Sequence, residues 1–237
     1  MSLGPLTILI ATANPHKVGE LRPIFDTSLA DTRGVHLLTL DEAGALTFPP
    51  RTFSEPAETG ATFAANARIK ALAYAAQSGL IALADDSGLE VDALGGRPGV
   101  ISSHYSSDGR EVGIARAQRD PANTGRVLDE LAGVSAARRT ARFVCCMCLA
   151  APGVPHSDRS DSILAETRAT LEGRIGVEPE IPRGHNGFGY DPIFLLAPDF
   201  TRTSAELDPS EKNRISHRAQ AAAAMAAHIR GLLTNRR

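Results

Sequence analysis

The sequence predicts an α/β fold with a mixed sheet, because segments typical of buried strands alternate with segments typical of helices. Short apolar runs suited to strands occur at residues 6–11, 80–84, 141–150 and 163–172. Helices are expected to begin near residues 15, 62 and 216. The 237 residues suffice for one large domain or two small lobes, and we predict a single domain over residues 1–237.

The first expected strand leads directly into a helix start. Asn14 is a typical N-cap, and Pro15 fits the first helical position. Free N–H groups at a helix N-terminus favour an anion, and Lys17 adds a full positive charge. The segment lacks the Gly-Lys-Ser/Thr ending of a Walker A loop, so a phosphate-binding loop and a simple capped turn both remain open. Its residues are Thr12, Ala13, Asn14, Pro15, His16 and Lys17.

The second helix is expected between Thr62, which is a suitable cap, and Gly79, which is placed to end it. Its apolar residues recur at helical spacing at Phe63, Ala67, Ala71 and Tyr74. Lys70 within this helix and Glu58 before it are polar residues whose simplest interpretation is a solvated surface.

A carboxylate pair follows the strand expected over residues 80–84. Asp85-Asp86-Ser87-Gly88 has the composition of a turn, so we expect the pair at a strand end. If the extended geometry persists, Asp85 and Asp86 point to opposite faces, and one can meet a ligand while the other has a structural role. Such a carboxylate can hold a divalent cation or take a proton from water. The alternative is an ordinary turn.

Residues 184–192 are the most unusual segment, because three glycines flank two aromatic residues in a chain with only 5% aromatic residues. Glycines let the backbone approach a ligand closely. Phe188 offers a stacking face to a base, and Asp191 offers a carboxylate acceptor. The alternative is a glycine-rich hairpin with a buried aromatic ring.

Basic residues gather around the start of the last expected helix. Cations in a first turn oppose the helix dipole, so Lys212, His217 and Arg218 favour an anionic or carbonyl-rich ligand. Arg218 can donate a forked pair of hydrogen bonds, and His217 can donate or accept. A weakly unfavourable exposed pair is the alternative.

The composition excludes several classes of protein. The net charge of -2 provides no positive field for nonspecific nucleic-acid or membrane binding. No apolar stretch reaches the ~20 residues that cross a bilayer. The three cysteines, Cys145, Cys146 and Cys148, lie in one strand-like run, where we interpret them as buried small hydrophobes. We therefore expect a soluble cytoplasmic protein.

Five segments together resemble the non-canonical purine nucleoside triphosphate pyrophosphatases, the inosine triphosphatase family. They are TANPHKVGEL, ETGATFAANARIKA, LADDSGLEVDALGGRPGVISSHYS, GHNGFGYDPIF and SAELDPSEKNRISHRAQA. The resemblance implies an elongated mixed sheet flanked by helices, with two lobes around a central nucleotide-binding cleft, and a homodimer. It also implies Mg²⁺-dependent release of pyrophosphate from inosine, deoxyinosine or xanthosine triphosphates, which would keep these nucleotides out of DNA and RNA.

The resemblance also implies roles for single residues. Glu58 and Asp86 match the metal carboxylates, and Asp86 matches the general base. Lys70, Ser87 and Lys212 match substrate contacts. The triphosphate loop corresponds to Thr12, Ala13, Asn14, Pro15, His16 and Lys17, the base-binding loop to Phe188, Gly189, Tyr190 and Asp191, and the residues reading the keto edge of the base to His217 and Arg218.

The chain departs from the family pattern in small ways. Longer loops are expected at residues 31–34, 49–54 and 157–161, and Ser103 stands where alanine is expected. Two alternatives to the implied activity remain. A pyrophosphatase for modified pyrimidine nucleotides would use similar chemistry. A catalytically silent nucleotide-binding regulator would have no need of Glu58 and Asp86.

Overall fold

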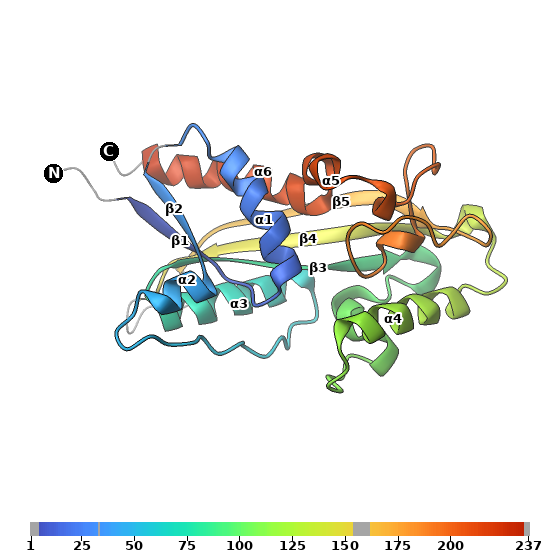
Figure 1. Ribbon diagram of the computed structural model, residues 1–237, viewed down its shortest axis with the longest axis horizontal. Helices are drawn as coiled ribbons and strands as arrows, with labels where there is room; N and C mark the ends of the chain where they lie inside the picture. The colour runs from blue at the N-terminus through green and yellow to red at the C-terminus, as the bar shows by residue number, and fades with distance from the viewer. Residues whose placement is uncertain (1–4, 33, 154–161, 235–237) are drawn as a thin grey trace. The chain divides into compact units, whose positions relative to one another are not determined.

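The structure, a computed structural model, describes residues 5–32, 34–153 and 162–234 (Figure 1). The loop expected at residues 157–161 therefore lies outside the described residues. The helices are α1 (Pro15–Ser28), α2 (Leu40–Ala45), α3 (Phe63–Ser78), α4 (Arg116–Glu130), α5 (Pro209–Ile215) and α6 (His217–Thr234). Short 3-10 segments lie at Asp92–Leu94, Gly99–Ser107, Ala136–Arg138, Asp191–Ile193 and Ser204–Glu206.

Six strands form one sheet in the order β2-β1-β3-β4-β5-β6. They are β1 (Leu6–Ile10), β2 (Val35–Thr39), β3 (Ile81–Val91), β4 (Thr140–Ala150), β5 (Ile163–Ile175) and β6 (Phe194–Leu196). β1 pairs in parallel with both β2 and β3, whereas β5 and β6 are antiparallel. The mixed sheet and the α/β class predicted from the sequence are therefore confirmed.

The chain divides into two compact units, each with its own hydrophobic core. The first comprises Met1–Asp86, Cys145–Ala169 and Arg218–Arg237, and the second comprises Ser87–Val144 and Thr170–His217. β3, β4 and β5 each contribute residues to both units.

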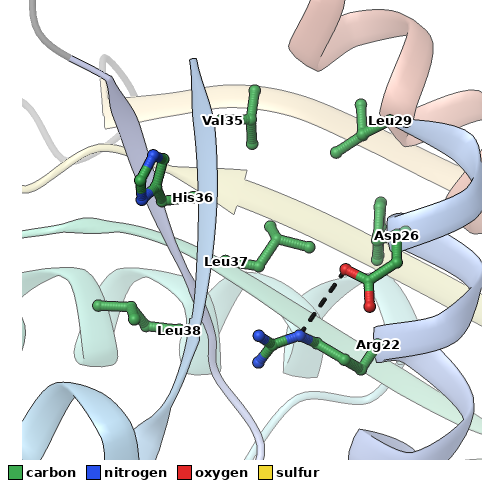
Figure 2. A pocket seen from close by; sticks show the side chains of 8 residues that line it. Arg22, Asp26, Leu29, Val35, His36, Leu37 and Leu38 are labelled. Carbon is green, nitrogen blue, oxygen red and sulfur yellow. Dashed lines mark ion pairs between the residues drawn. The ribbon is translucent and has the colours of Figure 1, made fainter. Parts of the chain in front are cut away.

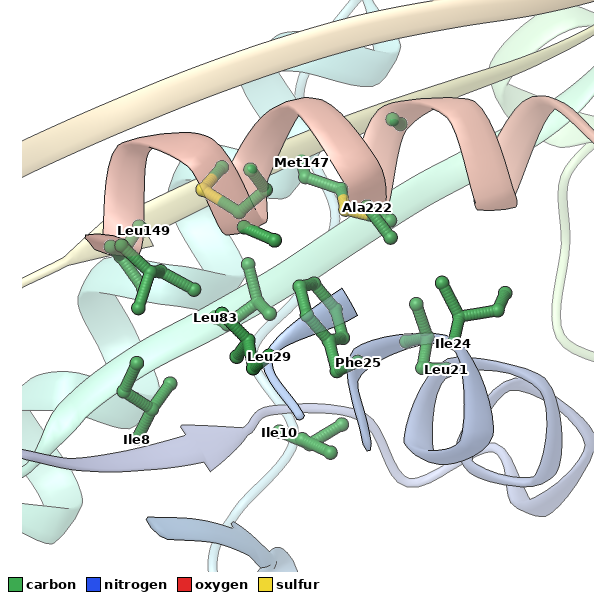
Figure 3. Packing of buried hydrophobic residues seen from close by; sticks show 14 of the residues in the cluster. Ile8, Ile10, Leu21, Ile24, Phe25, Leu29, Leu83, Met147, Leu149 and Ala222 are labelled. Carbon is green, nitrogen blue, oxygen red and sulfur yellow. The ribbon is translucent and has the colours of Figure 1, made fainter. Parts of the chain in front are cut away.

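The core of the first unit joins α1 and α6 to the strands (Figure 3). Ile8 and Ile10 of β1 and Phe25 of α1 are fully buried there. α6 supplies small residues, such as Ala222 and Ala226, which let its backbone pack closely on the sheet. α3 supplies none of the residues of this cluster and lies on the other side of these strands in Figure 1.

The core of the second unit contains two tyrosines whose hydroxyl groups find partners within the same unit. Tyr190 donates to the Ser102 carbonyl oxygen at 2.8 Å, and Tyr105 donates to a Glu130 carboxylate oxygen at 2.6 Å. Buried hydroxyl groups are costly without such partners. The Tyr190 bond attaches Gly99–Ser107 to the segment after residue 189, and the Tyr105 bond attaches it to α4.

The predicted helix starts are confirmed. The Asn14 side chain accepts the His16 N–H at 3.0 Å at the start of α1. The Thr62 hydroxyl accepts the Ala65 N–H at 3.1 Å at the start of α3, and Gly79 ends that helix with a φ of 70°.

One local prediction is wrong. Residues 85–88 form no turn, because β3 continues through them to Val91. Two observations give the physical reason. Asp85 and Asp86 each form an ion pair with a lysine of another element, Lys17 and Lys70 respectively. The hydroxyl of Ser102 also occupies the place that a side chain at Gly88 would take. Tertiary contacts therefore outweigh the local turn propensity.

The three cysteines are buried and unbridged, as predicted. Burial raises the pKa of Cys145 above its usual range and that of Cys148 to about 12. The thiols of Cys145 and Cys148 therefore stay protonated, and all three cysteines pack as small apolar groups. Among the residues that the structure describes, no helix is long and apolar enough to span a membrane.

A hollow of about 350 Å³ lies between α1 and β2 (Figure 2). Arg22 and Asp26 form an ion pair at its wall, with 3.8 Å between their charged atoms. Its lining residues are Arg22, Phe25, Asp26, Leu29, Val35, His36, Leu37 and Leu38. None of them belongs to the predicted substrate or metal site.

The core of the first unit yields a stability prediction. Phe25→Ala should lower the free energy of unfolding by about 3–5 kcal/mol, because it leaves a cavity among well-packed residues. Phe48→Ala is the matched control, since Phe48 is fully exposed, and it should change stability by less than about 0.5 kcal/mol. Urea denaturation measures both. Equal losses would contradict this assignment of the core.

Candidate active site

Asp85 lies at the centre of a buried ion-pair cluster in the first unit. Its side chain is 1% exposed, and its Oδ2 atom lies 3.0 Å from Lys17 Nζ and 3.5 Å from Arg218 Nε. Arg218 also forms an ion pair with Glu20 of α1. Lys17 reaches this position because Asn14 starts α1 three residues earlier, which places Lys17 in the first helical turn.

The electrostatics of this cluster keep Asp85 ionised. Burial by itself opposes ionisation, but the charges of Lys17 and Arg218 outweigh it and hold the pKa of Asp85 well below its usual range. The carboxylates of Asp85 and Glu20 in turn raise the pKa of Arg218 despite its burial. Asp85 therefore acts as a fixed counter-ion that orients Lys17 and Arg218.

Asp86 belongs to a second cluster, built around Lys70 of α3. Lys70 Nζ lies 3.0 Å from Glu58 Oε1 and 3.1 Å from Asp86 Oδ1. Asn66, one helical turn before Lys70, donates to Asp86 Oδ2 at 3.2 Å and accepts the Gly60 N–H at 2.7 Å. The two carboxylates predicted to bind metal are thus brought together on one ammonium group.

The two ionisable groups at the centre of this second cluster both have shifted pKa values. Burial raises the pKa of Asp86, although Lys70 and Lys17 oppose the shift. Burial lowers the proton affinity of Lys70, but the carboxylates of Asp86, Asp85 and Glu58 raise its pKa overall. A carboxylate with a raised pKa is a better proton acceptor from water than an ordinary aspartate.

The donor set of Glu58 and Asp86 fits Mg²⁺. Magnesium prefers oxygen ligands and is commonly held by one or two carboxylates together with water and substrate phosphates. Within the described part of the chain, no group of three or more His, Cys, Asp or Glu side chains is arranged to hold a metal ion. A pair of carboxylates suits a Mg²⁺ ion that completes its coordination with water and phosphate oxygens.

The glycine-rich loop of the second unit is organised by Asp191. Its Oδ2 atom accepts the Phe188 N–H at 2.8 Å and the Lys212 ammonium at 2.7 Å. Gly187 has a φ of 79°, and a side chain there would collide with this carboxylate and with Lys212. The loop therefore requires glycine at this position.

The Phe188 ring lies beside two cations. Lys212 Nζ is 5.4 Å from the ring centre, and the guanidinium carbon of Arg116 is 5.2 Å from it. Both distances are within the range of cation–π attraction. The ring itself is half-buried, so part of its surface is accessible for stacking.

Two other predicted residues pack inside the second unit. Tyr190 is 5% exposed, and its hydroxyl is bound to the Ser102 carbonyl, so this side chain has a packing role. His217 is 6% exposed and stacks on Phe143, with ring centres 5.2 Å apart and planes 18° apart.

The predicted residues are distributed over both units. The first unit holds the expected triphosphate loop at residues 12–17, where the Thr12 hydroxyl accepts the Asn14 N–H at 3.2 Å. It also brings together the residues of the two ion-pair clusters, namely Lys17, Glu58, Lys70, Asp85, Asp86 and Arg218. The second unit holds Ser87, Phe188, Gly189, Tyr190, Asp191, Lys212 and His217.

Four residues that contact the predicted site residues were not predicted: Glu20, Asn66, Arg116 and Asp120. Asn66 had a usable signal, because it lies four residues before Lys70 and therefore shares its helix face. Lys212 also differs from expectation, since it lies in the separate short helix α5 rather than beside the start of α6.

Known proteins are similar to this one over almost the whole chain. The model of the Ham1 family matches residues 8–228. A protein of Methylococcus capsulatus named dITP/XTP pyrophosphatase is 44% identical over 225 residues, covering 95% of this chain and 96% of the relative. A Bacillus subtilis protein of the same name is 42% identical, covering 90% of this chain and 91% of the relative.

Solved structures are similar as well. A HAM1 protein from Coxiella burnetii is 36% identical with a TM-score of 0.73, and the match covers 97% of this chain and 99% of that one. A nucleoside-triphosphatase, or dITP/XTP pyrophosphatase, from Mycobacterium abscessus is 38% identical with a TM-score of 0.66, covering 93% and 98%. The resemblance found in the sequence is therefore confirmed, and the chain belongs to the Ham1 family.

Proposed function

We propose that this protein hydrolyses inosine, deoxyinosine and xanthosine triphosphates to the nucleoside monophosphate and pyrophosphate. The observation that carries the proposal is the ion-pair cluster in which buried Lys70 holds Glu58 and Asp86 together. A protein that only binds nucleotides has no need of this carboxylate pair. The relatives named dITP/XTP pyrophosphatase, which are 42–44% identical over at least 90% of the chain, support the deoxyinosine and xanthosine triphosphates among these substrates.

In this proposal, Glu58 and Asp86 hold Mg²⁺, which when bound neutralises triphosphate charge. Asp86 orients a water molecule toward the α-phosphorus and accepts its proton. The bond between the α-phosphorus and the bridging oxygen breaks, and pyrophosphate leaves. Lys17 and the N–H groups at the start of α1 stabilise the negative charge of this leaving group.

Base selection is assigned to Phe188, which stacks on the purine, and to His217 and Arg218, which donate to its 6-keto oxygen. Adenine carries an amine at that position, so the donors would be left unpaired. Guanine shares the keto group and should be excluded less strongly. Asp85 and Glu20 support the assignment by fixing the Arg218 guanidinium.

We further propose that the protein works as a homodimer in the cytoplasm and forms no stable complex with nucleic acid. The family resemblance supports the dimer, and the net charge of -2 argues against nonspecific nucleic-acid binding. Three buried thiols without disulfides suit a reducing compartment. Sedimentation equilibrium measures the dimer directly.

The activity is tested with a panel of inosine, xanthosine, adenosine, guanosine and pyrimidine triphosphates. Monophosphate and pyrophosphate should form preferentially from the inosine and xanthosine compounds, and a chelator should abolish turnover because Glu58 and Asp86 then lack their cation. Parallel assays follow nucleotide products and released pyrophosphate. Formation of diphosphate and phosphate would refute attack at the α-phosphorus, and binding without turnover would favour a silent regulator.

The two adjacent aspartates should respond differently to the same substitution. Asp86→Asn should lower kcat by ~10²- to 10⁴-fold with a smaller change in KM, because it removes the proton acceptor. Lys70 keeps Glu58 as a partner in this variant. Turnover at the wild-type rate would refute the role of Asp86.

Asp85→Asn is the matched variant. It should lower the free energy of unfolding by about 3 kcal/mol, because Lys17 and Arg218 lose their buried counter-ion. Urea denaturation of both variants, with kcat and KM measured beside it, separates the structural carboxylate from the catalytic one. Unchanged stability of Asp85→Asn would show that this cluster does not hold the fold.

A further inference from the structure

Helix α4 contacts the glycine-rich loop that carries Phe188. Asp120 of this helix accepts the Gly189 N–H on its Oδ2 atom at 3.0 Å. Gly189 has a φ of 62°, a conformation that L side chains rarely adopt. Asp120, which binds this N–H, lies 69 residues away in the sequence. Its side chain is only 17% exposed.

Asp120 also holds the cation beside the Phe188 ring. Arg116 Nη1 lies 3.7 Å from Asp120 Oδ2, and the guanidinium carbon of Arg116 lies 5.2 Å from the centre of the ring. The same carboxylate oxygen thus contacts the loop backbone just after Phe188 and the guanidinium that lies over its ring. Hydrogen bonds to a charged acceptor are about twice as strong as neutral ones, which suits a positioning role.

The helix that carries these residues is itself firmly attached within the second unit. Asn123 accepts the Ser106 N–H at 2.8 Å and donates to the carbonyl oxygens of Ser102 and Ser103 at 3.3 and 3.1 Å. The Ser102 carbonyl also accepts the Tyr190 hydroxyl. The Ser102 carbonyl therefore contacts both α4 and Tyr190, which lies two residues after Phe188.

We infer that Asp120 is a positioning residue for the base-stacking ring of Phe188 and that Arg116 acts with it to set base specificity. Asp120 fixes the backbone of the loop, and Arg116 fixes the orientation of the ring from one side while Lys212 contacts it from α5. The position of the ring in turn sets how a stacked base meets the groups that read its edge. The inference rests on the proposed function.

The decisive experiment compares Asp120→Ala with Asp120→Asn. The alanine variant should raise KM for inosine triphosphate about 10-fold with kcat within about 2-fold, as expected when a charge-assisted hydrogen bond that supports binding is lost. Its preference for inosine over adenosine triphosphate in kcat/KM should fall. The asparagine variant keeps an oxygen that accepts the Gly189 N–H, so KM should return to within about 3-fold of the wild type.

Asp129→Ala is the matched control, because Asp129 is an exposed aspartate of the same helix. It should leave KM, kcat and base preference unchanged. The role of Arg116 is tested in the same way, since Arg116→Ala should raise KM and lower the base preference. Arg138→Ala is its control, because Arg138 is an exposed arginine of the same unit, and it should change neither quantity.

Amide hydrogen exchange gives a readout that does not require activity. Peptides covering residues 184–192 should exchange faster in Asp120→Ala than in the wild type or in Asp129→Ala, because the loop loses its link to α4. Thermal denaturation of each variant checks that the fold is intact. If Asp120→Ala fails to fold, the test passes to Arg116→Ala, for which an unchanged KM and base preference would overturn the inference.

The outcomes separate this inference from the proposed function. A wild-type protein that releases pyrophosphate from inosine triphosphate, together with an Asp120→Ala variant of unchanged KM and loop exchange, would overturn the inference and leave the proposed function standing. A wild-type protein that hydrolyses none of the triphosphates would overturn both. Raised KM with rescue by Asp120→Asn supports the positioning role.

Discussion

The pairing of buried lysine and arginine side chains with two adjacent aspartates of β3 is the interaction on which the rest of the site depends. Strand geometry sends Asp85 to one face and Asp86 to the other, so each meets a different set of cations. Burying a charge is expensive unless it is paired, so each aspartate constrains the elements that carry its partners. α1, α3 and α6 are held to β3 by these ionic contacts as well as by apolar packing.

This division explains why two identical neighbouring side chains have different chemistry. Asp85 is surrounded by Lys17 and Arg218, which stabilise its charged form so strongly that its pKa is far below the usual range. Asp86 shares Lys70 with Glu58, and its burial dominates, so its pKa is raised. One carboxylate is a permanent counter-ion, and the other is suited to exchange a proton.

Local sequence signals predicted a large part of this structure, because caps and apolar spacing depend on residues close together in the chain. Asn14, Thr62 and Gly79 mark helix ends as expected. The turn expected at residues 85–88 was wrong, since the partners that keep this segment extended lie far away in the sequence. Asp120 was missed for the same reason, because its contact with Gly189 spans 69 residues. The start of α4 also lacks a side-chain N-cap, so the sequence gives no local signal for this helix.

The alternation of side chains along β3 also limits how this chain can change in length. Inserting or deleting one residue within β3 before Asp85 would move each aspartate to the other face, so one of the two ion-pair clusters would receive Ala84 or Ser87 in place of a carboxylate. Such a change would keep the composition of the chain nearly unchanged but leave buried cations without a counter-ion. A change of length is therefore tolerated less well in β3 than in loops such as residues 49–54.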